Sequence, residues 1–430
     1  MKLEAPKNPN YCATVVRVRS LVDLPNSDYL KGMPMFGLQA IVGLETQVGD
    51  LGILFPAEVQ LSNEFVCQNN LFRHAALNLD PEAKPGYLED NRRVRAITLR
   101  GNRSDALFLP LSSIGAMIGD KSAAGDEPLS LDEGDQFDTF LGHEVCQKYV
   151  IPVRSHGGRG LQAGRRLKAR LDSRVFPEQY DIKQFFRVSE TLDPYAHVIV
   201  TQKLHGTSIR VGNVPVRRKL SWWERVLRRM GVRVQETEYA MIYGSRRVIK
   251  DANNPETLDS RYGEDIWTRE GRKLDGLVPE NYVVYGELIG WTPEGGAIQK
   301  HYTYDCRPGT CRLYVYRVSI VNASGVVADL SWAALKEFCA STGLNHVPEL
   351  EDDHLYNIDV DIYLDKRLKD EYAEEVIEAI ALSDDSPCDE GVCIRFEGII
   401  PQIFKAKSPM FFQLETQLLD KAETGEYTGI

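Results

Sequence analysis

The fold is decided by the stretch TQKLHGTS at residues 201–208, which directly follows the apolar run VIV at residues 198–200. The apolar run predicts a buried strand, so Lys203 lies just beyond its end. A lysine amine becomes a nucleophile only after it loses its proton, and burial or nearby cations lower its pKa. Gly206 permits a tight turn of the backbone beside a bound group. Taken alone, the stretch is better explained by an ordinary surface lysine before a turn.

Five further blocks follow this stretch in order. They are MIYGSRR (241–247), VVYGELIG (283–290), RLYVYRV (312–318), DEGVCIRF (389–396) and FKAKS (404–408). Each combines a strand-like apolar run with one or two polar or aromatic residues. In the last block, alternation along a strand places Lys405 and Lys407 on one face, where they can bind an anion. The ordered series is therefore far more informative than any single block.

The series resembles that of the covalent nucleotidyltransferases, a superfamily of RNA ligases, DNA ligases and mRNA capping enzymes. The form Lys-x-His-Gly-Thr at residues 203–207 resembles one branch of the RNA ligases, whereas Lys-x-Asp-Gly is the usual superfamily form. The chain is most similar to the ATP-dependent RNA ligases of Deinococcus and Naegleria type. The resemblance implies an α+β fold, with an N-terminal OB-like β-barrel followed by a nucleotidyltransferase (ATP-grasp-like ligase) domain of antiparallel sheets with flanking helices.

The resemblance also implies the roles of individual residues. Lys203 is the expected catalytic nucleophile, and ATP is its expected substrate. The expected nucleotide-binding residues are Gln202, Leu204, His205, Gly206, Arg246, Glu287, Tyr316, Lys405 and Lys407. Arg247 is a one-residue alternative to Arg246.

Tyr316 occupies the position of an aromatic residue that stacks on adenine. Glu390 is expected to place Mg²⁺ or Mn²⁺, and Glu287 to face the ribose or to hold the metal through water. The cations Lys405 and Lys407 are expected to bind the α-phosphate and to lower the pKa of Lys203.

Residues 1–150 contain short alternating runs separated by turn-prone residues, a pattern typical of a small β-barrel. The block RVRAITLRG at residues 93–101 resembles one in the N-terminal OB-like, nucleic-acid-binding domain of these ligases. Its cations are expected to contact RNA and comprise Arg92, Arg93, Arg95, Arg100 and Arg103. A solvated basic strand face is the alternative.

The remaining boundaries come from composition. A basic, glycine-rich linker is expected at residues 151–175, the nucleotidyltransferase domain at 176–415 and a C-terminal tail at 416–430. Ser331 predicts the start of a helix over 332–342 that Gly343 ends. The run 217–233 predicts an inserted amphipathic helix, whose Trp222 and Trp223 are expected to pack on the core, with RNA clamping as the alternative.

Composition excludes several classes of protein. The 430 residues carry a net charge of −11, so no general basic character indicates nucleic acid, although a local basic face can still bind it. No apolar stretch is long enough to span a bilayer and no signal peptide is apparent, so a cytoplasmic monomer is expected. The eight cysteines favour free thiols over zinc ligation by the pairs Cys306/Cys311 and Cys388/Cys393.

The expected function is ATP-dependent joining of RNA 3′-hydroxyl and 5′-phosphate ends, at a nick or a bridged break, through lysyl-AMP and RNA-adenylate intermediates. An mRNA capping guanylyltransferase is one alternative, and labelling with GTP instead of ATP would distinguish it. A DNA nick sealer is a second, separated by the sugar that it requires at the nick. A non-catalytic RNA-binding protein with the same fold is a third, against which the intact Lys203, Glu287 and Glu390 argue.

Overall fold

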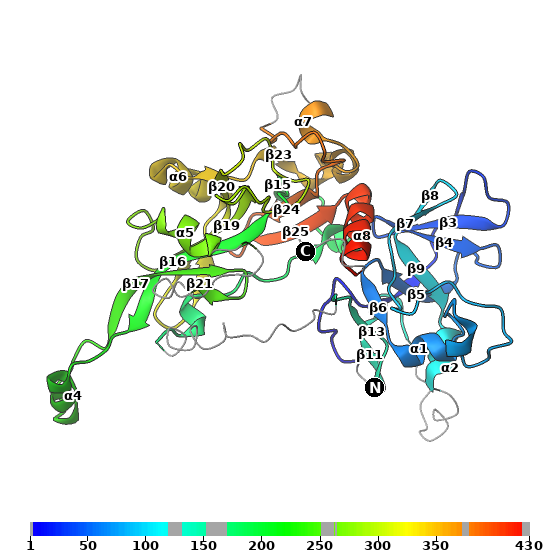
Figure 1. Cartoon of the computed structure of the whole chain (residues 1–430), viewed down its shortest axis with the longest axis horizontal. Coiled ribbons are helices and arrows are strands. Elements are labelled where there is room, and N and C mark those ends of the chain that lie inside the picture. The colour runs from blue at the N-terminus through cyan, green and yellow to red at the C-terminus, as the bar shows by residue number, and fades with distance from the viewer. Residues whose placement is uncertain are drawn as a thin grey trace. The chain divides into compact units, whose positions relative to one another are not determined.

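The computed structural model describes residues 3–118, 131–151, 170–250, 262, 265–371 and 378–423 (Figure 1). These residues divide into two compact units, which are considered separately. Unit 1 comprises residues 1–152 together with 409–428, and unit 2 comprises residues 153–408, in both cases as far as they are described. Most of the basic linker expected at 151–175 lies outside the described residues, as do residues 424–430 of the expected tail.

Unit 1 is built on a seven-stranded sheet with the order β10-β1-β5-β9-β4-β3-β2. Its strands are β1 (Ala13–Arg17), β2 (Val22–Asp23), β3 (Leu30–Met35), β4 (Leu38–Gly43), β5 (Leu51–Pro56), β9 (Ala106–Pro110) and β10 (Gln136–Phe137). The pairing of β4 with β9 is parallel and the others are antiparallel. Among the described strands, no pairing joins β10 to β2, so the expected OB-like barrel stays a prediction.

Smaller elements complete unit 1. Three two-stranded sheets pair β6 (Val59–Leu61) with β13 (Cys146–Lys148), β7 (Ile97–Leu99) with β8 (Asn102–Ser104), and β11 (Thr139–Phe140) with β12 (His143–Glu144). The helices are α1 (Asn63–Gln68), α2 (Ser112–Ile118) and α8 (Pro409–Glu423). Helix α1 begins where the Ser62 hydroxyl accepts a hydrogen bond from the Phe65 N–H, which satisfies one of the unpaired donors at the helix start.

Helix α8 belongs to unit 1 although it is the last described element of the chain. Phe412 enters a core cluster formed by strands of the seven-stranded sheet, and the Thr416 hydroxyl donates to Glu58 at 2.7 Å. The expected division at 415/416 therefore differs from the structure, because one continuous helix crosses it and packs on the N-terminal strands.

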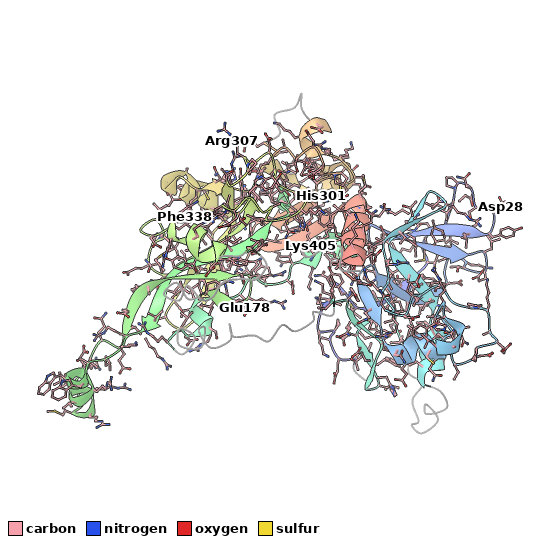
Figure 2. The ribbon with its side chains drawn as sticks, in the orientation of Figure 1. Asp28, Glu178, His301, Arg307, Phe338 and Lys405 are labelled. Carbon is pink, nitrogen blue, oxygen red and sulfur yellow. The ribbon has the colours of Figure 1, made fainter. Side chains whose placement is uncertain are left out.

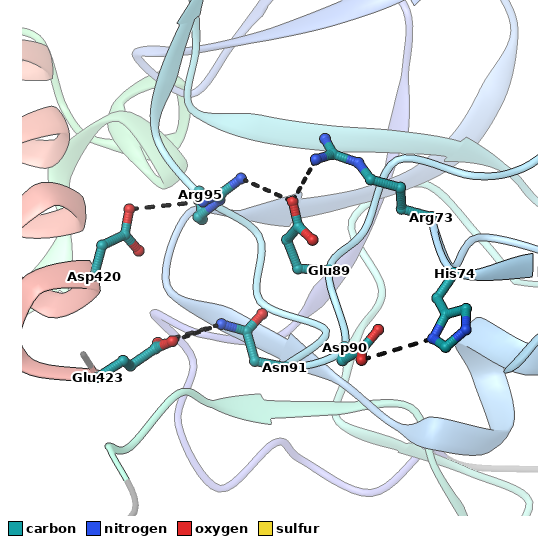
Figure 3. Close-up of a pocket in the computed structure, with 8 residues that line it drawn as sticks. All are labelled: Arg73, His74, Glu89, Asp90, Asn91, Arg95, Asp420 and Glu423. Atoms are coloured by element: carbon teal, nitrogen blue, oxygen red, sulfur yellow. Dashed lines mark hydrogen bonds and ion pairs between the residues drawn. The ribbon is translucent and has the colours of Figure 1, made fainter.

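Two of the cations expected to contact RNA, Arg93 and Arg95, pair with acids of this unit. The Arg93 side chain is fully buried and forms ion pairs with Glu58 at 2.9 Å, Asp420 at 2.8 Å and Glu423 at 3.3 Å. Arg95 lies beside Glu89 and Asp420 in a mixed-charge pocket of about 600 Å³ (Figure 3). The expectation for Arg93 was wrong, because this arginine joins α8 to the N-terminal strands.

Unit 2 contains two antiparallel sheets. One has the order β14-β25-β24-β15-β23, with β14 (Lys183–Gln184), β15 (His197–Gln202), β23 (Glu349–His354), β24 (Gly391–Phe396) and β25 (Gln402–Lys407). The other has the order β18-β17-β16-β19-β20-β21, with β16 (Thr207–Arg217), β17 (Thr237–Ser245), β18 (Ile249–Lys250), β19 (Tyr282–Gly290), β20 (Cys311–Val321) and β21 (Val327–Asp329). Two short pairings are parallel, β14 with β25 and β20 with β22 (Asn345–His346).

The helices of unit 2 are α4 (Trp222–Arg229), α5 (Ile266–Arg272), α6 (Trp332–Thr342) and α7 (Leu368–Glu371). Helix α6 has the predicted bounds, because Ser331 caps its start and Gly343, in the left-handed region at φ 70°, ends it. Helix α4 forms where expected, but its tryptophans do not pack on the core. Trp222 and Trp223 are 61% and 60% exposed, which corrects that expectation. No described helix is long and apolar enough to cross a membrane.

Candidate active site

The strand β15 ends at the centre of the site. It pairs on one side with β24 and on the other with β23, and the N–H of Lys203 donates to the Gly391 carbonyl at 3.0 Å. The buried residues Val198, Ile199 and Val200 anchor the strand in the sheet. Lys203 is therefore held at a fixed point, directly opposite the start of β24.

Two lysines and a histidine meet at the Glu390 carboxylate. The Lys203 ammonium lies 2.7 Å from the Glu390 carboxylate, Lys407 lies 3.7 Å from it, and the His205 ring lies 3.3 Å from its other oxygen. The Glu390 side chain is only 5% exposed and that of Lys203 22%. Lys203 and His205 come from one block of sequence, and folding brings it together with the two later blocks that carry Glu390 and Lys407.

The protonation states follow from this cluster. Burial alone would lower the pKa of Lys203, but the Glu390 carboxylate outweighs it and raises the pKa above its ordinary value. Burial would likewise raise the pKa of Glu390, yet Lys203, His205 and Lys407 hold it well below its usual range. Lys407 does lower the pKa of Lys203, as expected, but Glu390 raises it by more, so the expected net lowering is absent in this state.

Lys405 behaves differently from Lys203. It lies on β25 in unit 2 (Figure 2), two residues from Lys407 and paired in register with Cys393. Burial, together with the neighbouring Lys407 and Lys203, lowers the pKa of Lys405 to about 7. The two lysines of β25 therefore share one strand face, as alternation predicts.

Glu287 is a second, partly buried acid of the site. It lies on β19, and its carboxylate accepts a hydrogen bond from the Gly206 N–H at 3.1 Å. Burial raises its pKa to about 8, against the influence of Lys203. A partly buried carboxylate with this pKa is suited to bind a cation or a hydroxyl group, either of which would compensate for its lost hydration.

Gly206 and Gly391 are glycines for steric reasons. A Cβ on Gly206 would lie 2.1 Å from the Leu288 carbonyl, so the backbone after Lys203 can approach β19 only without a side chain. Gly391 has φ 129°, and a Cβ there would lie 2.1 Å from the Ala406 carbonyl. Both glycines thus set the distance between the strands of the site.

The Gly391→Ala variant is expected to lower the catalytic rate by about 10²-fold, because the added methyl would push β24 away from β25 and displace Glu390. Gly398→Ala is the matched control, since a Cβ there meets nothing closer than 3.9 Å and should leave the rate unchanged. The rates would be compared in purified variants with equal thermal stability. Equal rates for the two variants would contradict this role of Gly391.

The other expected nucleotide-binding residues occupy two kinds of position. The Gln202 amide is buried and bonds Asp389 at 2.6 Å and the Ile380 backbone, and Leu204 is buried, so both side chains face the interior. Tyr316 is half-buried on β20, and its hydroxyl lies 2.8 Å from that of Ser208. Arg246 follows β17 and is ion-paired with Asp181, which Arg247 also contacts at 3.2 Å.

Sequence reasoning missed two tyrosines beside the site. The backbone N–H of His205 donates to the Tyr304 hydroxyl at 2.6 Å. The Tyr302 and His205 rings meet edge-to-face, with their centroids 4.9 Å apart. Both tyrosines are fully buried. Gln299 also supports the turn, because its amide donates to the Gly206 carbonyl at 2.8 Å. The only signal for the tyrosines was a Tyr-Thr-Tyr sequence shortly after Gln299.

The residues could hold a hard divalent cation through oxygen. Among the described residues there is no cluster of three or more His, Cys, Asp or Glu side chains that could hold a metal. Glu390 and Glu287 fit the alternative in which one or two carboxylates bind Mg²⁺ together with substrate phosphates. The cysteines 306, 311, 388 and 393 are free thiols.

The family model for RNA ligases matches residues 196–407, the segment that carries all of these residues. This segment belongs to the RNA ligase family. The protein is therefore an enzyme of the RNA ligase type. A search of curated protein sequences found no match.

Solved structures agree on the fold. A lysine-to-alanine mutant of Naegleria gruberi RNA ligase, determined with ATP and Mn, has 14% sequence identity and a TM-score of 0.56, and the match covers 95% of this chain and 99% of that one. The same Naegleria ligase with pyrophosphate (PPi) has 16% identity and a TM-score of 0.55, covering 94% and 98%. At such identities the likeness establishes a mixed α/β fold with antiparallel sheets, as in the Naegleria ligase.

Proposed function

We propose that the protein joins RNA 3′-hydroxyl and 5′-phosphate ends through a covalent lysyl-AMP and then an RNA-adenylate. The observation that supports this most strongly is the cluster of Lys203 with Glu390, Lys407 and His205 at the end of β15. A solvated lysine would need neither a buried carboxylate at 2.7 Å nor a second lysine, on β25, beside that same carboxylate.

In the first step the Lys203 nitrogen attacks the α-phosphorus of ATP, a phosphorus–nitrogen bond forms, and pyrophosphate leaves. The 5′-phosphate of RNA then takes AMP from Lys203, and finally a 3′-hydroxyl displaces AMP to form the phosphodiester. Lys405 and Lys407 bind the α-phosphate and stabilise the charge that develops on its oxygens. Tyr316 stacks on adenine. Arg246 contacts the nucleotide after its ion pair with Asp181 has broken.

Glu390 would hold Mg²⁺ or Mn²⁺ together with the phosphates, and Glu287 would hold it through water or bind the ribose. Such a cation would neutralise phosphate charge and orient the triphosphate. The cation would also compete with Lys203 for the Glu390 carboxylate. Loss of this ion pair would lower the pKa of Lys203, which is how the amine would reach its reactive form.

Unit 1 is proposed as the OB-like domain that binds nucleic acid, with Arg92, Arg100 and Arg103 as its remaining candidate cations. The proposed substrate is RNA with a nick or a bridged break. RNA, ATP and a divalent metal would suffice, and a monomer would be active. The Naegleria ligase was determined with ATP and Mn and with AMP and Mn, which supports the choice of nucleotide and metal.

Incubation with Mn²⁺ and ATP labelled at its α-phosphate is expected to add one AMP to the chain, whereas labelled GTP should add nothing. The adenylated protein, freed of ATP, should then seal a nicked RNA duplex once per AMP. Mass spectrometry and gel electrophoresis would measure the two steps. Labelling by GTP alone would support the capping-enzyme alternative instead, and labelling by neither nucleotide would contradict the proposal.

A further inference from the structure

A separate element of unit 2 has no role in the site described above. Strands β16 and β17 form a long antiparallel hairpin, and helix α4 lies at its far end, apart from the other elements of the unit (Figure 1). The helix is defined locally, because the Ser221 hydroxyl and the Glu224 carboxylate form a reciprocal capping box. Because α4 does not pack on the core, the exposed apolar side chains of this helix call for a different explanation, such as binding to a partner.

The apolar side chains of α4 gather on one arc. At 100° per residue, Trp222, Val226, Met230, Trp223 and Leu227 follow one another around the helix within an arc of about 140°. Both indoles and Met230 are more than half exposed, with Met230 at 71%. The two indoles stack on each other with ring centroids 3.6 Å apart and 27° between planes. They form a single aromatic plate, which we call the tryptophan plate, that remains in contact with water.

The rest of this segment is strongly basic. Residues 217–233 contain seven basic side chains, those of Arg217, Arg218, Lys219, Arg225, Arg228, Arg229 and Arg233. Glu224 is the single acid among them, and it is bound by Arg218 and the Ser221 backbone. The chain as a whole has a net charge of −11, so the helix is a local exception. Its charge complements a polyanion.

We propose that α4 binds a single-stranded segment of RNA that flanks the joined ends, with an unpaired base stacked on the tryptophan plate and phosphates bound by the surrounding arginines. Single-stranded RNA is recognised by aromatic side chains combined with cations, the two features that meet here. A membrane or a protein groove would contact only the apolar arc. RNA would contact both the apolar arc, through its bases, and the basic side chains, through its phosphates, and RNA is also the proposed substrate of this enzyme.

The hairpin also connects the helix to the site. Strand β16 begins at Thr207, four residues after Lys203, and β17 ends at Ser245, beside Arg246. The ten residue steps from Thr207 to Arg217 span roughly 34 Å at the rise of an antiparallel strand. That length corresponds to about ten stacked nucleotides at 3.4 Å each. An RNA bound at Lys203 would therefore reach α4 only if the RNA extends about ten nucleotides beyond the site.

The inference rests on the proposed function for its RNA, but its test is independent of catalysis. The double variant Trp222→Ala/Trp223→Ala is compared with Tyr195→Ala/Tyr356→Ala, which removes another exposed, contacting aromatic pair from unit 2, at 74% and 60% exposure. Two probes are used, a nicked RNA duplex that becomes single-stranded about ten nucleotides from the nick, and the same duplex with blunt ends. Affinity is measured by fluorescence anisotropy of labelled RNA.

The tryptophan variant is expected to bind the tailed RNA about tenfold or more weakly, because stacking on an aromatic side chain strengthens binding by at least that factor. It should bind the blunt duplex as the unaltered protein does, and it should still take up AMP. The tyrosine variant should match the unaltered protein on both probes. Tailed RNA should also quench tryptophan emission, since Trp222 and Trp223 are the exposed members of the five tryptophans.

Equal affinity of the tryptophan variant and the unaltered protein for tailed RNA would overturn the proposal. So would a blue shift of the tryptophan emission with vesicles of anionic phospholipid but no change with RNA, which would identify a lipid surface as the occupant. If the protein takes up no AMP, the proposed function fails, yet the two affinities still decide whether α4 binds RNA.

Discussion

Replacing Lys203 with alanine is expected to abolish the transfer of AMP from ATP to the protein. No other described side chain combines a primary amine with the position at the end of β15, 2.7 Å from Glu390. Loss of a covalent nucleophile lowers catalysis on the order of 10⁴-fold or more, so no label should be detected. The measurement is the mass of the protein after incubation with ATP and Mn²⁺.

Two further variants make this result specific. Lys203→Arg keeps a cation beside Glu390, but a guanidinium does not lose its proton, so this variant should fold normally and also remain unlabelled. Lys336→Ala removes a lysine of α6 that is paired with Glu349 of β23, and this variant should still be labelled. Covalent AMP on another residue of Lys203→Ala would refute the assignment.

Replacing Arg93 with methionine is expected to destabilise unit 1 by about 3–5 kcal/mol, because Glu58 would be left buried without its partner. The Arg93 guanidinium makes two hydrogen bonds with Glu58, at 2.9 and 3.0 Å, and a third with the Thr416 carbonyl at 3.1 Å. Burial already raises the pKa of Glu58 against the influence of Arg93. Thermal unfolding should begin roughly 10 °C lower, given a shift of a few degrees per kcal/mol.

Arg95→Met is the matched control for this prediction. Arg95 is 30% exposed, and its ion pairs measure 3.6 and 3.8 Å, so its loss should cost less than about 1 kcal/mol. The double variant Arg93→Met/Glu58→Met should recover much of the lost stability, because no buried charge is left unpaired. A similar Tm for the two single variants would show that the buried ion pair contributes little.

The central site could be predicted because its residues occur in short blocks whose spacing is informative by itself. Lys203, Glu390 and Lys407 each belong to such a block, and the structure brings all three together. The raised pKa of Lys203 could not be predicted, since it depends on whether the Glu390 carboxylate or the neighbouring cations have the larger effect on the amine. Only the folded pairing of β15 with β24 and of β24 with β25 decides this.

Elements with local signals were predicted well, and those with distant partners were not. Helix α6 could be bounded from Ser331 and Gly343 because both act within one turn. Arg93 looks like any cation of a basic strand, but its partner Asp420 is 327 residues away. The tryptophans of α4 have the spacing of a core-facing helix, yet spacing does not reveal whether a core lies opposite.

Helix α8 has a consequence for how the protein is made. Unit 1 obtains Phe412, Thr416 and Asp420 from a segment that the ribosome produces only after all of unit 2. The first strands to emerge must therefore wait, with part of their apolar surface uncovered, until helix α8 has been translated. A stop codon anywhere within unit 2 would leave two unfinished domains rather than one.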